Sequence, residues 1–174
     1  CQSAVRENAY THQGPPTVVS VSPAAGPLAG GTTITLTGTL FRPGITATVN
    51  GVACTTSTYV NATSMTCITP AQAAGTYAVS VLNTDGQTGS LGGGYTYQPA
   101  PTVTSVNLNF GPVSGGQTVT ITGTGFVSGI TARINGTPCT SPTFVNATTM
   151  TCVTPAQAIG TYAVAVLNSD GQSG

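Results

Sequence analysis

Residues 75–87 decide the fold, and they read Gly-Thr-Tyr-Ala-Val-Ser-Val-Leu-Asn-Thr-Asp-Gly-Gln. Apolar and small polar side chains alternate along this stretch, which is typical of a half-buried β-strand. Asp85-Gly86 then predicts a tight turn into a partner strand. The partner follows as Gly94-Tyr95-Thr96-Tyr97-Gln98. The sequence therefore predicts a β-hairpin from Gly75 to Gln98.

The same pattern returns 85 residues further on, because residues 16–89 align with residues 101–174 without a gap. About two-thirds of the aligned positions are identical. Each copy holds several short strand patterns separated by Gly, Pro and Asn-Gly turn signals, and neither copy shows helical periodicity. Many short strands within fewer than about 100 residues are typical of a β-sandwich. The fold class is therefore predicted to be all-β, with two sandwiches in tandem.

The second copy reaches Gly174 without a counterpart of Tyr95–Gln98. The matching residues stand at the opposite end of the chain, where Asn8–Gln13 resembles Gly93–Gln98 and is followed by a similar Pro-containing segment. The second sandwich is therefore expected to lack its final strand. The predicted organisation is an N-terminal strand-like arm at 1–15, a first domain at 16–98, a Pro linker at 99–100 and a second domain at 101–174.

The charge of the chain restricts its partners. The chain has three Arg, no Lys and three Asp or Glu in total, so its net charge is zero. Nucleic-acid binding needs a basic surface that displaces counterions, so no nucleic-acid partner is expected. No apolar run approaches the roughly 18–20 residues that cross a bilayer. Because Thr, Ser, Gly and Asn supply the solubility, the composition favours an extracellular or cell-surface protein.

Four of the five cysteines form two equivalent pairs, Cys54 with Cys67 and Cys139 with Cys152. Zinc sites need clustered Cys and His ligands, and His12 is the only histidine. One disulfide per repeat is therefore expected, which implies an oxidising compartment. Closing a loop of this length stabilises a fold by roughly 3 kcal/mol in the chain-entropy model.

Cys1 is the fifth cysteine and has no partner in the repeat. A chain that begins with Cys-Gln-Ser-Ala resembles a bacterial lipoprotein after signal cleavage, in which this cysteine carries the lipid. An intermolecular disulfide through Cys1 is the competing interpretation. Membrane contact is expected only through such a lipid.

Several motifs together resemble the IPT/TIG family of immunoglobulin-like domains. They include Gly30-Gly31 before Thr32–Gly38, Val49-Asn50-Gly51 before Cys54, and Thr69-Pro70 before Gly75-Thr76-Tyr77. Most of them recur in the second copy, although the counterpart of Tyr95 is missing there. The resemblance implies an Ig-like sandwich for each copy. It implies a function less directly, because such domains serve as spacers, adhesive arrays and parts of receptors or DNA-binding factors.

No catalytic constellation is apparent, so no enzyme and no cofactor or metal is predicted. Asp85 and Asp170 stand in equivalent turns, where Asp-Gly is explained by turn geometry. Two pairs of aromatic residues, Tyr59 with Phe144 and Phe41 with Phe126, either pack in the core or form a platform for surface glycans. Candidate glycosylation sites begin the three Asn-x-Thr sequons, and ordinary turn asparagines are the alternative: Asn61, Asn135 and Asn146.

A sandwich without its final strand exposes an edge that another strand can pair with. The hypothesis is a non-enzymatic extracellular subunit that polymerises head-to-tail into a surface filament with copies of itself. The expected inter-subunit strand comprises Val5, Asn8, Ala9, Tyr10, Thr11, His12 and Gln13. The expected acceptor edge comprises Tyr162, Val164, Val166 and Asn168. The alternative is a segment of a longer adhesin or glycan-binding array that acts as a spacer or binding module.

Overall fold

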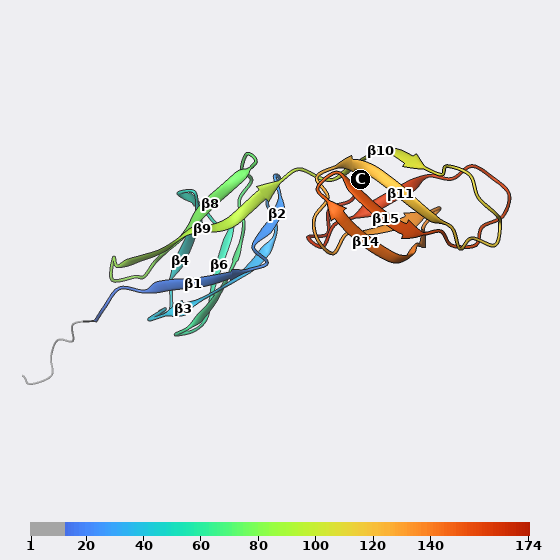
Figure 1. Ribbon diagram of the computed structural model, residues 1–174. Helices are drawn as coiled ribbons and strands as arrows, with labels where there is room; N and C mark the ends of the chain where they lie inside the picture. The colour runs from blue at the N-terminus through green and yellow to red at the C-terminus, as the bar shows by residue number, and fades with distance from the viewer. Residues whose placement is uncertain (1–12) are drawn as a thin grey trace, which may run out of the picture. The chain divides into compact units, whose positions relative to one another are not determined.

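A computed structural model describes residues 13–174, and within these residues the regular structure consists entirely of β-strands (Figure 1). The chain divides into two compact units, and residues 96–174 belong to the second. Each copy of the sequence repeat builds its own pair of sheets. The all-β class and the two tandem Ig-like sandwiches expected from the sequence are confirmed.

In the first repeat, one sheet has the strand order β1-β3-β7-β6 and the other has the order β2-β9-β8-β4-β5. The bounds of these strands are β1 Thr17–Ser22, β2 Ala25–Pro27, β3 Thr33–Thr39, β4 Thr46–Val49, β5 Val52–Ala53, β6 Thr56–Asn61, β7 Ser64–Ile68, β8 Gly75–Leu82 and β9 Thr88–Gln98. Strands β8 and β9 are the two arms of the hairpin predicted from Gly75 to Gln98. The second arm is longer than the predicted Gly94–Gln98, because β9 begins at Thr88.

In the second repeat, the corresponding sheets have the orders β10-β11-β15-β14 and β13-β12-β16. The bounds are β10 Thr102–Asn107, β11 Thr118–Thr124, β12 Thr131–Ile134, β13 Thr137–Pro138, β14 Thr140–Asn146, β15 Thr149–Val153 and β16 Val164–Leu167. The first of these sheets repeats its counterpart in the first repeat strand for strand. The second sheet differs, and this difference creates the site described below.

Alternating side chains produce the cores. Along β3 every second residue is buried, so that Ile34 and Leu36 point inward while the threonines between them are exposed. The counterpart β11 buries Val119 and Ile121 in the same way. This period of two is the one that strand geometry requires, because successive side chains leave opposite faces of a sheet.

Local sequence signals predicted the antiparallel strands well. The Asn50-Gly51 turn signal lies between β4 and β5, with Asn50 at a φ of 53° and Gly51 at 76°. Both angles lie in the left-handed region that a type I′ hairpin turn requires. Strand β2 was not predicted, because it has only three residues and pairs in parallel with the distant β9.

The two repeats differ at one edge of one sheet. In the first repeat β9 lies between β2 and β8, as Figure 1 allows the reader to follow. In the described part of the second repeat, no strand corresponds to β2, and only an isolated bridge between Leu167 and Ser173 corresponds to the start of β9. Strand β16 is therefore an edge strand and has four residues, whereas its counterpart β8 has eight.

Candidate functional site

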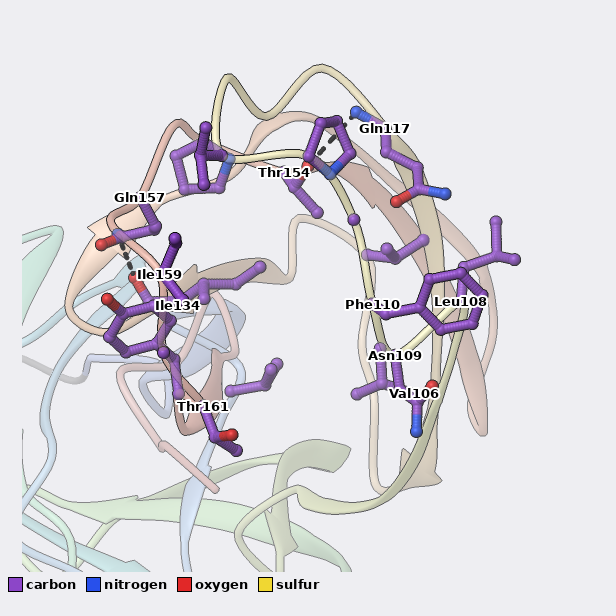
Figure 2. Close-up of a pocket in the computed structure, with 18 of the residues that line it drawn as sticks. Val106, Leu108, Asn109, Phe110, Gln117, Ile134, Thr154, Gln157, Ile159 and Thr161 are labelled. Atoms are coloured by element: carbon purple, nitrogen blue, oxygen red, sulfur yellow. Dashed lines mark hydrogen bonds between the residues drawn. The ribbon is translucent and has the colours of Figure 1, made fainter.

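The second repeat contains a groove of about 560 Å³ beside the edge strand β16. Figure 2 shows its two walls, with Val106 and Phe110 on one side and Ile134 and Ile159 on the other. Val164 of β16 also lines it. We call this cavity the second-repeat groove. Its lining is mostly apolar, and such a concave surface can accept a strand or another apolar ligand.

In the first repeat the corresponding space is filled by β9. Tyr95 and Tyr97 of this strand are both fully buried. The strand pairs in parallel with β2, where Gly26 is the partner of Tyr97, and the amide N of Thr96 donates to the carbonyl of Ala24 at 2.8 Å. In the second repeat the counterparts of Ala24 and of β2 line the groove: Asn109, Phe110, Gly111 and Pro112.

Equivalent apolar side chains are buried to different extents in the two repeats. Val49 and Val79 are fully buried in the first repeat, whereas their counterparts Ile134 and Val164 are only half-buried. At the rim, Phe110 is 78% exposed and Ile159 is 94% exposed. The second repeat therefore presents to solvent an apolar wall that the first repeat covers with its own strand.

The groove also contains one polar atom with unmet hydrogen-bonding capacity. The side-chain Oε1 of Gln117 is buried and accepts no hydrogen bond within the described part of the chain. It lies close to Gly111, the counterpart of Gly26. A buried acceptor without a donor costs about 1–3 kcal/mol, so an occupant that brings N–H or O–H groups suits this position.

Half of the predicted acceptor edge pairs with the C-terminal residues of its own repeat. The amide N of Val166 donates to the carbonyl of Gly174 at 2.9 Å, and that of Asn168 donates to the carbonyl of Gln172 at 2.9 Å. The prediction of Val166 and Asn168 as acceptor residues is therefore wrong, because residues 172–174 turn back and pair with them. Tyr162 and Val164 line the groove, and their role as acceptor residues stays a prediction.

The sequence analysis missed the loops on either side of the groove. Phe110, Gln117 and Ile159 correspond to Ala25, Thr32 and Ala74 in the first repeat. These are positions where a small residue in one copy is replaced by a larger one in the other. These groove residues could have been found in the sequence by comparing the two copies position by position for changes in side-chain size.

The predicted donor strand lies almost entirely outside the described residues. Val5, Asn8, Ala9, Tyr10, Thr11 and His12 are outside them, as is Cys1. Gln13 is described, and its carbonyl accepts a hydrogen bond from the side-chain Nε2 of Gln87 at 3.0 Å. The counterpart of this contact is the bond from Gln172 Nε2 to the carbonyl of Gln98 at 3.2 Å. Gln13 therefore precedes the first repeat as Gln98 precedes the second.

The turn that holds Gln98 contains the carboxylate of Asp170. Partial burial raises the pKa of Asp170, but hydrogen bonds from Gln98 and Gln172 outweigh this effect. The amide Nε2 atoms of Gln98 and Gln172 donate to Asp170 Oδ2 at 2.7 and 2.8 Å. The pKa of this carboxyl is consequently below its ordinary value, because the bonds favour the charged form.

The cysteines of the two repeats differ. Cys54 and Cys67 form a disulfide, with a Cα–Cα distance of 5.8 Å. The second expected disulfide is absent from the structure, where Cys139 and Cys152 are two buried thiols in mutual contact. Burial raises the pKa of the Cys152 thiol, and the neighbouring Cys139 raises it further. This thiol therefore stays protonated, and protonated thiols are poor nucleophiles.

The aromatic pairs separate into core and surface residues. Phe41 and Phe126 are buried, which excludes them from a platform for glycans in this structure. Phe144 is 37% exposed on β14, and Tyr59 is half-buried on β6. Among the described residues, no group of three or more His, Cys, Asp or Glu side chains is placed to hold a metal ion.

The three candidate glycosylation asparagines are exposed. Asn61 and Asn146 lie at strand ends, where each side-chain oxygen accepts bonds from the amide and hydroxyl of the threonine two residues later, at 2.9 Å. Asn135 has a φ of 52° in its Asn-Gly turn. All three positions thus have a local role in a turn, and their glycosylation remains a prediction.

No helix long and apolar enough to span a membrane occurs in the described part of the chain. The family model described as "IPT/TIG domain" matches residues 16–97 and 101–174. Plexin-2 of Caenorhabditis briggsae is 31% identical over 152 residues, which are 79% of this chain and 9% of the relative. Fibrocystin-L of Mus musculus is 33% identical over 156 residues, which are 88% of this chain and 4% of the relative. The chain thus spans less than a tenth of these curated relatives.

Among solved structures, the full extracellular region of plexin A4 is similar to this chain with a TM-score of 0.59 and 23% identity. The match covers 91% of this chain and 17% of the plexin chain. This likeness supports the fold of two successive Ig-like domains. The relatives also agree with the extracellular location that the composition and the paired cysteines favour.

Proposed function

Because the chain belongs to the IPT/TIG domain family, we propose that it is a non-enzymatic, extracellular structural subunit that polymerises head-to-tail into a surface filament. In this proposal the inter-subunit strand, which is residues 5–13 of the N-terminal arm, leaves one subunit and enters the second-repeat groove of the next. The arm supplies the strand that the first repeat already possesses as the end of β9.

The observation that carries the proposal is the contrast between the two repeats. Tyr95 and Tyr97 fill the space beside β8 in the first repeat, while the equivalent space beside β16 is an apolar groove. Sequence supplies a matching occupant, because residues 10–13 align with residues 95–98 and Tyr10 stands in the place of Tyr95. The carbonyl of Gln13, the last residue of the inter-subunit strand, accepts a hydrogen bond from Gln87, just as the carbonyl of Gln98 accepts one from Gln172.

The energetics favour a stable contact. A hydrogen bond between backbone groups contributes about 1 kcal/mol net. Burial of a tyrosine side chain adds roughly 2–3 kcal/mol. Several such bonds together with one buried ring suffice for a specific protein contact. Because the donor arm and the acceptor groove belong to different surfaces of the subunit, the contact is heterologous and propagates into a filament unless it closes into a ring.

Deletion of residues 1–13 tests the proposal. The full chain is expected to form fibres in electron micrographs, whereas the shortened chain is expected to be monomeric by light scattering. A matched control keeps the length of the arm but scrambles residues 5–13, and it is also expected to be monomeric. Fibres formed by the shortened chain, or a monomeric full chain at high concentration, contradict the proposal.

The second candidate is a segment of a longer array that acts as a spacer or binding module, with surface glycans as one class of partner. The coverage of 9% and 4% of the curated relatives favours it, because both relatives extend far beyond the matched residues. In this case the residues that follow Gly174 in the same polypeptide fill the groove. A reading frame that continues beyond Gly174 with a Tyr-Thr-Tyr-like strand decides for this candidate.

A further inference from the structure

The first repeat contains, within one chain, a strand contact that residues 101–174 do not form among themselves. Strand β9 pairs with β2 in parallel, with Ala25 opposite Thr96 and Gly26 opposite Tyr97. On its other side, the hydroxyls of Thr96 and Thr76 lie 2.9 Å apart across β9 and β8. These contacts fix the register of the strand to a single residue, because a slip by one residue turns every side chain to the opposite face.

We infer that the arm of a second subunit enters the second-repeat groove in one register, with Thr11 opposite Thr161 and His12 opposite Gly111. This inference rests on the proposed function. The shift of 85 residues that relates the repeats converts Thr96 to Thr11 on the donor, and Thr76 to Thr161 on the acceptor. The same shift places the amide of Thr11 at the carbonyl of Asn109, the counterpart of the bond from Thr96 to Ala24.

The side chains of the arm suit this register. Tyr10 takes the place of the fully buried Tyr95 and points into the groove between its apolar walls. Thr11 lies on the opposite face of the strand, next to the exposed Thr161. His12 replaces the buried Tyr97 with a smaller ring that carries N–H donors. It enters beside Gly111, where the Oε1 of Gln117 is buried and accepts no hydrogen bond within residues 13–174.

The register also defines how the arm leaves the groove. Gln13 takes the place of Gln98, and its carbonyl is already bound by Gln87 of its own subunit. Gln13 is therefore both the last residue of the inserted strand and a residue held against the first repeat of the donor subunit, so no linker residue separates the two. At the junction between subunits, the hydrogen bond from Gln87 to Gln13 then corresponds to the bond from Gln172 to Gln98 within the chain.

Engineered disulfides between two full-length chains test the register. Both chains carry Cys1→Ser, the first also carries Thr11→Cys, and the second carries Thr161→Cys. The hydroxyls of Thr76 and Thr96 lie 2.9 Å apart in the first repeat, so cysteines at the corresponding positions 161 and 11 are expected to come within reach of a disulfide in this register. Mild oxidation of the mixture is expected to yield a covalent dimer, and mass spectrometry is expected to identify a peptide that joins residues 11 and 161.

The matched control replaces Thr11→Cys with His12→Cys, which faces the other side of the strand and is expected to yield at least tenfold less cross-linked dimer. Assembled fibres in which residue 12 cross-links to residue 161, and residue 11 does not, overturn the register but leave the proposed function intact. A bond between residues 11 and 161 within one chain carrying both substitutions, in a sample that stays monomeric, overturns both. The unsubstituted full chain, observed in parallel by electron microscopy, reports on the proposed function alone.

Discussion

Asp170 Oδ2 accepts a hydrogen bond from the side-chain amide of Gln98 at 2.7 Å. Gln172 donates to the same oxygen at 2.8 Å and also to the carbonyl of Gln98. One charged oxygen thus links the residue that precedes the second repeat to the turn that follows β16. Because these hydrogen bonds favour the charged form of the carboxylate, the stability of this turn is expected to depend on pH.

The second repeat is expected to lose stability in acid through Asp170. Its pKa in the folded chain is below the ordinary value, so the stabilisation is complete above about pH 4 and is lost as the pH falls further, through the folded-state pKa. Calorimetry of the full chain between pH 7 and pH 2 measures this effect. Asp170→Asn is expected to flatten the acid dependence of the second-repeat transition, and an unchanged dependence contradicts this role.

Tyr95 of the first repeat and Tyr10 of the N-terminal arm align in the sequence, but their replacement by alanine is expected to have different effects. Tyr95→Ala removes a fully buried ring from the first repeat and is expected to destabilise that repeat by about 3–5 kcal/mol in denaturant unfolding. Tyr10→Ala is expected to leave the unfolding of the unassembled chain unchanged but to prevent fibre formation. Loss of folding stability in the Tyr10→Ala variant at low concentration argues that the arm packs on its own subunit.

A charge at the rim of the second-repeat groove is expected to block assembly without unfolding the repeat. Phe110 is 78% exposed, so Phe110→Asp removes little buried area, yet its carboxylate must lose water when a strand enters. The matched control is Val145→Asp on β14, a position that is 54% exposed and does not line the groove. Light scattering is expected to show monomers for the first variant and polymers for the second. Equal assembly of both variants contradicts a role for the groove.

The two buried thiols are expected to react slowly in the folded chain. Burial and the neighbouring Cys139 both raise the pKa of Cys152, so little thiolate forms at neutral pH. In a Cys1→Ser background, a thiol reagent is expected to modify Cys139 and Cys152 only after denaturation. If no thiol titrates even in denaturant, the two cysteines are bonded to each other in the isolated protein.

Much of the fold follows from local patterns in the sequence. The alternation along β8 and the Asn-Gly turn signal at Asn50-Gly51 are local features, and the structure has strands and a turn at these places. Strand β2 was missed because its three residues gain their structure from a parallel partner about 70 residues away. Such a contact depends on tertiary packing, which leaves no periodic signal in so short a segment.

The edge position of β16 beside the groove is consistent with the repeat alignment, in which no residue of 101–174 aligns with Tyr95–Gln98. The extent of the acceptor edge was not predicted correctly. Val166 and Asn168 were predicted to belong to the acceptor edge, but residues 172–174 turn back to pair with both. The groove walls at Phe110 and Ile159 come from loops, whose positions depend on the whole sheet rather than on their own residues.

The most direct measurement is the affinity of a fluorescent peptide with the sequence of residues 5–13 for the chain that lacks residues 1–13, followed by anisotropy. The peptide is expected to bind saturably, one per chain, with a Kd in the micromolar range or tighter, which corresponds to roughly −8 kcal/mol or better. The peptide with Tyr10→Ala is expected to bind at least tenfold more weakly. Absence of binding at millimolar peptide, or equal binding of both peptides, contradicts the claim that the second-repeat groove accepts the N-terminal strand of another copy.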